Sequence, residues 1–507
     1  MNEYSIVPAA EGAAKPAQNP EKFYEIQPKD PLSLLFTLLF CIFLADAFLW
    51  HGPSAALGVT VFLWYALLLR QLGSAPLLQR HNQVLLLTNL FLALTFALGS
   101  SWAFRLWNLL VLLVLLPVHA WSLSGAGLLN WWQPVMLWER FCLTLWGLFG
   151  NLGAPFAVLL SGKKQTLRKA LPLVLGLGIS AVLVAVLLPV LISADALFAF
   201  ATEGFRNFLR DHFSVGLRKV LAGLVMTPFV FGFLYSLRHP KPLKASAHTP
   251  FRAEDVLFIT VLLALDILYL LFLAVQSSGL FGGADYLAAR GISYAEWARS
   301  GFFQMVGVTA LNLTVLLVAL SFSRQQGKGR NAVRILSAAL VLESLVLLAS
   351  AAWRMGLYVS AYGLSFKRFM TYWGMVMMAL LFFTALLKIR RPDFSFCRTA
   401  FPLMLAGWLV INCIPVDYLV AKHQVDRYLS GKSTTVSVHY LAHSLSYDTL
   451  SQRDRLEDDT LLCTLEGRWW GQEETLGTLL ERRRESARVD CADWHTWSLS
   501  AWLASCE

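Results

Sequence analysis

The chain has 507 residues, of which 57% are hydrophobic and only 15% are charged. Soluble globular proteins carry about 25% charged and about 45–50% apolar residues, so this composition excludes a chain folded mostly in water. The net charge of +10 does not indicate nucleic-acid binding, because Lys and Arg gather in short loops between long apolar runs, as membrane insertion requires. The sequence therefore predicts an all-α protein, a polytopic transmembrane helical bundle.

The chain begins with a polar tail, residues 1–30, that lacks the pattern of a cleavable signal peptide. Apolar runs long enough to cross about 30 Å of hydrocarbon at about 1.5 Å per helical residue follow it. We expect about eleven spans, near residues 31–50, 53–69, 84–100, 106–122, 170–192, 220–237, 256–276, 305–322, 335–353, 372–389 and 399–416.

The run 141–160 leaves two topologies open. It contains three glycines, a proline and an asparagine, and it follows a Trp-rich segment suited to the membrane interface. If it is interfacial or re-entrant and the N-terminus is cytoplasmic, 22 basic residues lie in cytoplasmic segments and 10 in outer loops. If it crosses, the split is 17 to 15. The positive-inside rule favours the first topology, with an extracytoplasmic C-terminus.

Two outer loops and the C-terminal region have features of their own. Residues 193–219 show the pattern of an amphipathic helix on the membrane surface, and residues 277–304 that of a Gly-rich turn and a short helix. Residues 417–507 are charged, and we expect them to form a small helical extracytoplasmic domain. An oxidising compartment permits a disulfide there, with Cys463 and Cys491 as first choice, although spacing alone does not fix the pairing.

Three acids interrupt the apolar runs. Asp46 lies near the outer end of its span, so we expect it to reach the interface and assign it no role. Asp266 and Glu343 fall near the middle of their spans, where a buried carboxylate costs about 2.5–3.5 kcal/mol on insertion scales. They are candidates for a proton or cation relay or a substrate anchor. The alternative is a hydrogen bond that only locks two helices together.

Further polar residues follow Glu343 along the chain. Arg354 stands three helical turns later, about 16 Å away at the usual rise per residue, so we place it at the outer end of the span. Tyr358 and Tyr362 lie between Gly356 and Gly363 and predict a structured outer loop. Together with Asp266 and Glu343, these three residues form the candidate polar site.

The segment RMGLYVSAYGLSFKR at 354–368 resembles a motif of a bacterial multi-pass membrane family known as domain of unknown function 4173. SADALF at 193–198 and YAEWARSGFF at 294–303 fit the same pattern, and residues 417–450 are similar to that family's ending. The resemblance covers roughly residues 130–450 and implies a polytopic protein of the bacterial inner membrane. It supplies no activity.

Other motifs do not carry chemistry. GKST at 431–434 lacks the glycine that a phosphate loop needs. His439 and His443 are spaced for one helix face, but no third metal ligand is evident, so they are a weak metal candidate. We find no signature of a nucleophile, a redox pair or a dinucleotide site. We therefore expect no cofactor and no catalytic residues, and an enzyme is the least favoured class.

Two functions remain. The first is transport of a small solute or ion that uses the acids in the middle of the membrane. The second is a non-catalytic envelope sensor or assembly component that acts through residues 417–507. The expected partners are the lipid bilayer and, for the second function, an envelope protein.

Overall fold

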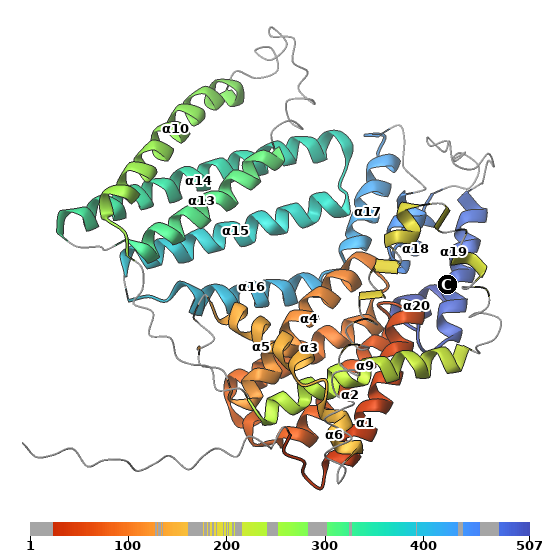
Figure 1. Ribbon diagram of the computed structural model, residues 1–507. Coiled ribbons are helices and arrows are strands. Elements are labelled where there is room, and N and C mark those ends of the chain that lie inside the picture. Colours follow the sequence, from red (N-terminus) through yellow and green to blue (C-terminus); the bar gives the residue numbers. More distant parts are fainter. Residues whose placement is uncertain are drawn as a thin grey trace, which may run out of the picture. The chain divides into compact units, whose positions relative to one another are not determined.

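The residues that the computed structural model describes are mostly helical (Figure 1). It describes residues 24–126, 135–160, 215–240, 252–281, 302–323, 327–391, 393–433, 440–456 and 476–506, with single positions between these ranges. Within these ranges there is no β-strand, apart from an isolated bridge between Ala253 and Ser323. The all-α architecture is confirmed.

Ten helices in the described part of the chain are long and apolar enough to cross a membrane. They coincide with ten of the eleven expected runs, so the protein is a multi-pass membrane protein. The eleventh run, 170–192, falls mostly outside the described residues, as do most of residues 193–219 and 277–304. The division into a cytoplasmic tail, a membrane bundle and an external domain stays a prediction.

The chain forms two compact units. One comprises Met1–Ile42 and Leu145–Ser236, and the other comprises Phe43–Thr144 and Leu237–Glu507. The first unit has a small core in which Leu34, Ala154, Val158, Phe231 and Tyr235 are buried together. α6 (Ala154–Leu159) lies wholly within this unit, and so does most of α9 (Val215–Arg238).

The run 141–160 forms two helical pieces rather than one span. α5 (Met136–Gly150) ends where Asn151 begins a turn, and α6 follows it after Gly153. Pro155 lies in the first turn of α6, where its missing N–H costs no helical hydrogen bond. Neither piece has the length of the ten candidate spans.

The second unit begins with three antiparallel helices. Before them, α1 (Asp30–Ala45), which belongs mostly to the first unit, leads into a π-helical turn of the second unit, η1 (Asp46–Trp50). The three helices that follow are α2 (Ala55–Leu72), α3 (Arg80–Leu98) and α4 (Trp102–Ser124), with the short 3₁₀ turn η2 (Ala75–Leu78) after α2. α2 and α3 pack closely at Gly58, where an added Cβ would lie 2.5 Å from the carbonyl oxygen of Ala93.

The second group of helices in this unit is α10 (Asp255–Phe281), α13 (Phe302–Phe322), α14 (Gly327–Tyr362), α15 (Phe366–Arg390) and α16 (Phe396–Cys413). α10 and α13 both pack against α14, and α14 packs against α15. Their shared core is apolar, with Leu262, Leu316, Leu340 and Phe382 fully enclosed.

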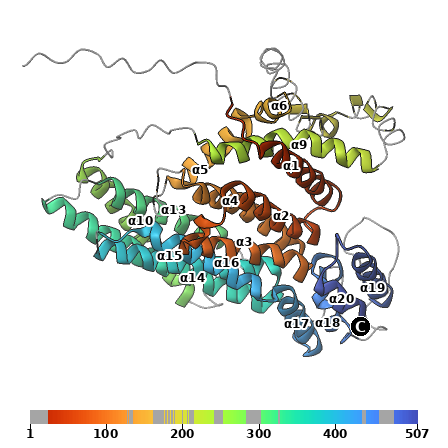
Figure 2. The ribbon, with the colours of Figure 1, turned by 90° about the horizontal axis from the view of Figure 1, so that it is seen from below.

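The C-terminal elements gather at one end of the second unit (Figure 2), where α20 contacts α3. They are α17 (Val416–Leu429), the turns η3 (Tyr440–Ser444) and η4 (Tyr447–Thr449), α18 (Leu450–Arg453), α19 (Leu476–Ala492) and α20 (Leu499–Cys506). This part of the chain is helical, as expected. Cys491 and Cys506 are free thiols, and Cys463 lies outside the described residues, so the disulfide stays a prediction.

Candidate functional site

The structure brings the two predicted acids together. Asp266 on α10 lies beside Glu343 on α14, and these two helices pack against each other. Asp266 is 4% exposed, whereas its neighbour Ile267 is 59% exposed. Glu343 is 6% exposed beside Leu342 at 59%. Both carboxyl groups therefore point into the helix bundle, while the adjacent apolar side chains point outward to where lipid would lie.

Few other polar groups approach these carboxyls. Among the described residues, no hydrogen-bond donor reaches either oxygen of Asp266. Two ionised carboxylates this close together, away from water, repel one another strongly. A proton on either carboxyl would relieve this repulsion.

A chain of hydrogen bonds lies beside the pair. The Tyr269 hydroxyl donates to Asn312 Oδ1 at 2.7 Å, and Asn312 Nδ2 donates to Ser344 Oγ at 3.0 Å. This series of hydrogen bonds ends at Ser344, which follows Glu343 directly in the sequence. It begins at Tyr269, which lies three residues after Asp266. We call Asp266, Glu343, Tyr269, Asn312 and Ser344 the polar seam.

The seam has an extension along α10. Gln276 donates to Ser350 Oγ on α14 at 2.6 Å. Gln276 is ten residues after Asp266, which corresponds to about 15 Å of helix, about half the thickness of the hydrocarbon core. Buried polar groups thus occur at the middle of α10 and again near its end.

Arg354, Tyr358 and Tyr362 do not join this seam. Arg354 is buried on α14 eleven residues beyond Glu343. α14 does not end there but continues through Tyr362, so the two tyrosines are helical rather than part of a loop. Their rings lie 5.0 Å apart, and the guanidinium of Arg368 stacks 4.1 Å from the Tyr358 ring.

A tight turn between α14 and α15 follows these aromatic residues. Gly363 follows the end of α14 and has a φ of 78°. Glycine adopts this left-handed conformation with the least strain, which is why it commonly ends helices. The Ser365 side chain accepts the backbone N–H of Arg368 and caps α15. Gln424 on α17 donates to the carbonyl of Leu364 at 2.6 Å. Residues 362–365, with the sequence YGLS, therefore form the turn between the two helices.

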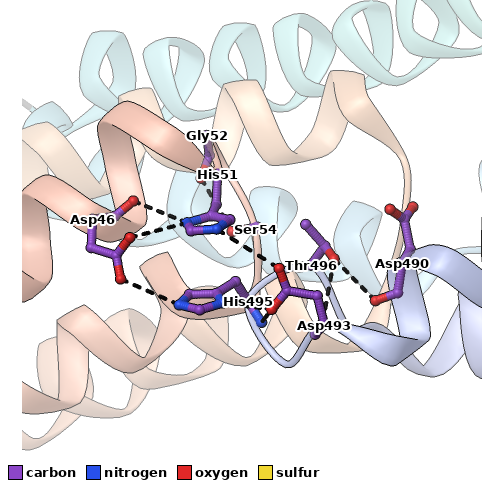
Figure 3. Close-up of polar contacts among 8 residues, drawn as sticks. All are labelled: Asp46, His51, Gly52, Ser54, Asp490, Asp493, His495 and Thr496. Atoms are coloured by element: carbon purple, nitrogen blue, oxygen red, sulfur yellow. Dashed lines mark hydrogen bonds and ion pairs between the residues drawn. The ribbon is translucent and has the colours of Figure 1, made fainter. Parts of the chain in front are cut away.

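A second polar cluster, which the sequence analysis did not identify, joins η1 to the C-terminal loop. Asp46, His51, Asp493 and His495 converge although the chain separates Asp46 from His495 by 449 residues. The two imidazole rings stack with centroids 3.9 Å apart and an angle of 6° between their planes. Figure 3 shows them lying between the two carboxylates, with Asp46 on one side and Asp493 on the other. We call these four residues the His/Asp cluster.

Each carboxylate of the cluster faces both imidazoles. Asp46 Oδ1 lies 3.4 Å from His51 Nδ1, and Asp46 Oδ2 lies 3.3 Å from His495 Nε2. On the other side, Asp493 Oδ1 lies 2.5 Å from His495 Nδ1, and Asp493 Oδ2 lies 3.8 Å from His51 Nε2. Asp46, His51 and His495 offer ligand atoms that all lie within 4.8 Å of one another, and this group alone met that condition in the described part of the chain.

Local structure explains how the cluster is positioned. The wider turn of η1 carries Asp46, and π-helical turns occur frequently at functional sites. The carbonyl of His495 accepts the N–H of Ala56 at 3.1 Å, so the C-terminal loop caps the start of α2. Trp494 stacks on Phe43 with centroids 5.9 Å apart. Farther along, Ser500 Oγ lies 2.9 Å from Ser100 Oγ in the loop between α3 and α4.

Hydrogen bonds and burial change the pKa values of two carboxyl groups in this region. The backbone N–H and the imidazole of His495 donate to Asp493, and these hydrogen bonds lower the pKa of the Asp493 carboxyl. Asp417 at the start of α17 is buried, and loss of hydration raises the pKa of its carboxyl, although the N–H of Ser446 donates to it at 3.1 Å.

The sequence contained little that could have revealed the His/Asp cluster. No two of its four residues have the spacing, within one helix, that is typical of a metal site. The interpretation of Asp46 as a residue that only reaches the interface left out its contacts with His51 and His495. The weak metal candidate cannot be compared, because His439 lies outside the described residues.

Comparison with known families gives one match. The model described as Domain of unknown function (DUF4153) matches residues 86–456, nearly three quarters of the chain. Among curated proteins and solved structures, no match to the chain is found. The matched range includes the polar seam but not Asp46, His51, Asp493 or His495.

The resemblance to domain of unknown function 4173 is therefore wrong as to family. Its main segment, residues 354–368, comprises a helix end, a left-handed glycine and a serine cap. Any two helices joined by such a turn need these residue types, so the segment is a weak marker of a particular family.

Proposed function

Since the chain belongs to the family described as Domain of unknown function (DUF4153), which carries no assigned activity, we propose its function from its own residues. The protein acts in transport of a small solute or ion across a bacterial inner membrane, and its ionisable centre is the pair Asp266 and Glu343. One observation carries this proposal. Two carboxyl groups that the bundle shields from lipid face each other near the middle of adjacent spanning helices.

The chemistry of the pair suits proton exchange. Ionisable residues at this depth are costly, so they occur chiefly where they face a partner, an ion or a substrate. A facing pair that holds one proton can release it when a cation or a basic substrate group approaches, and can take it back afterwards. The hydroxyl and amide groups of Tyr269, Asn312 and Ser344 supply donors and acceptors beside it.

The direction of the seam also supports a path to one membrane face. Gln276 and Ser350 extend the buried polar groups toward one end of α10. In the orientation that the basic loops favour, with the N-terminus cytoplasmic and the C-terminus extracytoplasmic, this is the outer end. The three cavities described in this structure are lined by other residues, so a path to the pair requires movement of α10 against α14.

The test uses the full chain in proteoliposomes that contain a pH-sensitive dye, with a membrane potential imposed by potassium and valinomycin. We expect proton flux through the wild-type protein. Glu343→Gln and Asp266→Asn should each lower it at least tenfold, because an amide can hydrogen-bond but cannot carry the proton. Both variants should keep the wild-type melting temperature. The control, Glu485→Gln, changes an exposed carboxylate of α19 and should keep full flux.

Three outcomes would contradict this proposal. Wild-type flux equal to that of empty liposomes removes the proton pathway. Full flux through Glu343→Gln shows that no proton passes through this side chain. Glu343→Gln melting as early as Glu343→Ala makes the acid a structural lock between helices.

A second function has one observation in its favour. Six charged residues of α19, three acidic and three basic, line a polar hollow on the C-terminal part: Glu481, Arg482, Arg484, Glu485, Arg488 and Asp490. Such a surface suits a contact with an envelope protein, so the alternative is a sensor or assembly component that acts through residues 417–507. A sensor would tolerate Glu343→Gln, whereas the proposed transport would not.

A further inference from the structure

We propose that the His/Asp cluster is a binding site for a divalent metal ion of the zinc class, with Asp46, His51 and His495 as ligands and Asp493 as the residue that orients the imidazole of His495. The ion would join the end of the first membrane helix to the C-terminal loop. This inference is independent of the proposed transport, since the cluster lies outside both the polar seam and the family match.

The distances fit a tetrahedral ion. Zinc binds histidine nitrogen and carboxylate oxygen at about 2.0–2.2 Å, which places two ligands of a tetrahedron about 3.3–3.5 Å apart. Asp46 Oδ1 lies 3.4 Å from His51 Nδ1, and Asp46 Oδ2 lies 3.3 Å from His495 Nε2. The three residues offer ligand atoms within 4.8 Å of one another. The two rings are stacked with nearly parallel planes, so they would have to turn before the lone pairs of both nitrogens point at one ion.

Asp493 supplies the support that metal-bound histidines usually have. A ligating imidazole donates its other N–H to a carboxylate or a carbonyl, which fixes its tautomer and its orientation. Asp493 lies 2.5 Å from His495 Nδ1 and 3.8 Å from His51 Nε2. The remaining nitrogen of each ring faces Asp46, where the ion would lie.

Charge favours a divalent occupant. With both carboxyls ionised and both imidazoles neutral, the four side chains carry two negative charges, which one divalent ion balances.

The donor atoms select the class of ion. Two imidazoles and a carboxylate suit zinc, cobalt, nickel or copper, whereas magnesium and calcium prefer sites made of oxygen alone. Three protein ligands leave a fourth position for water. The side chains of His51 and His495 are each 17% exposed and that of Asp46 is 19% exposed, so water and an ion can reach the site.

One contact opposes the ion and has to be displaced. His51 Nδ1 lies 3.1 Å from the backbone carbonyl of Asp46, to which it can donate when it carries a proton. A metal needs the lone pair of that nitrogen, so binding releases the proton to water. A cluster held only by hydrogen bonds is therefore the competing state, and the experiment distinguishes the two.

The experiment uses the full chain in detergent, stripped with a chelator, desalted, and titrated with zinc alone. We expect one zinc ion per chain by elemental analysis and a rise in melting temperature. His495→Gln and Asp46→Asn should each weaken binding at least a hundredfold. Asp493→Asn should weaken it about 10–100-fold, the usual cost of losing an orienting group. The control is His443→Gln, an exposed histidine of the same C-terminal part, which should bind zinc as the wild type does.

A second readout does not depend on variants. Zinc should protect His51 and His495, but not His443, from modification by diethyl pyrocarbonate, as located by peptide mass analysis. Wild-type protein that retains no zinc at micromolar concentration would overturn the proposal in favour of the hydrogen-bonded cluster. Equal binding by the wild type and all variants would place the ion elsewhere and overturn it as well.

Discussion

The polar seam and the His/Asp cluster place ionisable side chains in opposite surroundings. The carboxyls of Asp266 and Glu343 lie inside a bundle whose outer face is apolar, and they are nearly fully buried. Asp46, His51 and His495 lie half-buried at the end of a membrane span, where loops meet. A carboxyl pair enclosed by helices can exchange a proton without a large opening. A cluster at a loop junction can take up a whole hydrated ion.

The two regions also depend on the chain in different ways. The seam connects helices that follow one another closely, and α10 and α13 both pack on α14. The cluster connects segments 449 residues apart. Damage to the seam should therefore destabilise the bundle itself, whereas damage to the cluster should release the C-terminal part. The predictions below test that difference, beginning with the largest expected effect.

Asn312→Leu should lower stability most. Asn312 is fully buried and both accepts from Tyr269 and donates to Ser344. Its loss leaves two buried hydroxyls without their partner, at about 1–3 kcal/mol for each unsatisfied group. Thermal unfolding in detergent should show a clear fall in melting temperature. Thr314→Val on an exposed face of the same helix is the control and should change little. A fall that is equal in both variants would mean that the seam does not stabilise the bundle.

Gly58→Ala should act on the helices that support the cluster. The new methyl group would lie 2.5 Å from the carbonyl oxygen of Ala93, so α2 and α3 would have to separate. Overpacking of this kind costs about 1–3 kcal/mol. Gly374→Ala on α15 is the matched control, because an added Cβ there meets nothing within 4 Å. Zinc affinity should fall in Gly58→Ala and not in Gly374→Ala, whereas proton flux should be unaffected in both.

Asp417→Asn should give the smallest effect, and its sign depends on pH. Burial raises the pKa of Asp417, so the folded protein holds this proton more tightly than the unfolded chain does. The stability that the protonated form provides is complete below about pH 3.9 and is lost as the pH rises through the folded value. Asparagine resembles the protonated form, so the variant should melt about 2–4 °C higher at pH 7 for each kcal/mol recovered.

At pH 4 the wild type and Asp417→Asn should melt together, which is the internal control. A variant that is less stable than the wild type at pH 7 would show that the ionised carboxylate is the stable form.

Much of the fold could be predicted from the sequence because lipid imposes a simple rule. A helix that crosses hydrocarbon needs an uninterrupted apolar run, and ten such runs are helices in this structure. The span expected near residues 335–353 lies within α14, and the helix continues past Arg354 to Tyr362. It ends before Gly363, where the backbone adopts a left-handed conformation.

The candidate sites were predictable to different degrees for a related reason. An acid inside an apolar run stands out, so Asp266 and Glu343 could be named before their contact was known. Their facing arrangement needed the packing of α10 on α14. Asp493 and His495 lie among many other polar residues, and nothing in their spacing indicates that His51 will stack on His495.

The long separation of the His/Asp cluster along the chain has a consequence for synthesis. Asp46 and His51 emerge from the ribosome early, and His495 follows 449 residues after Asp46. At about 5–20 residues per second, the interval is roughly 20–90 s. During that time the start of α2 lacks the cap that the His495 carbonyl provides. The junction therefore closes only after the spans between have been made, and its closure marks a chain whose synthesis has passed residue 495.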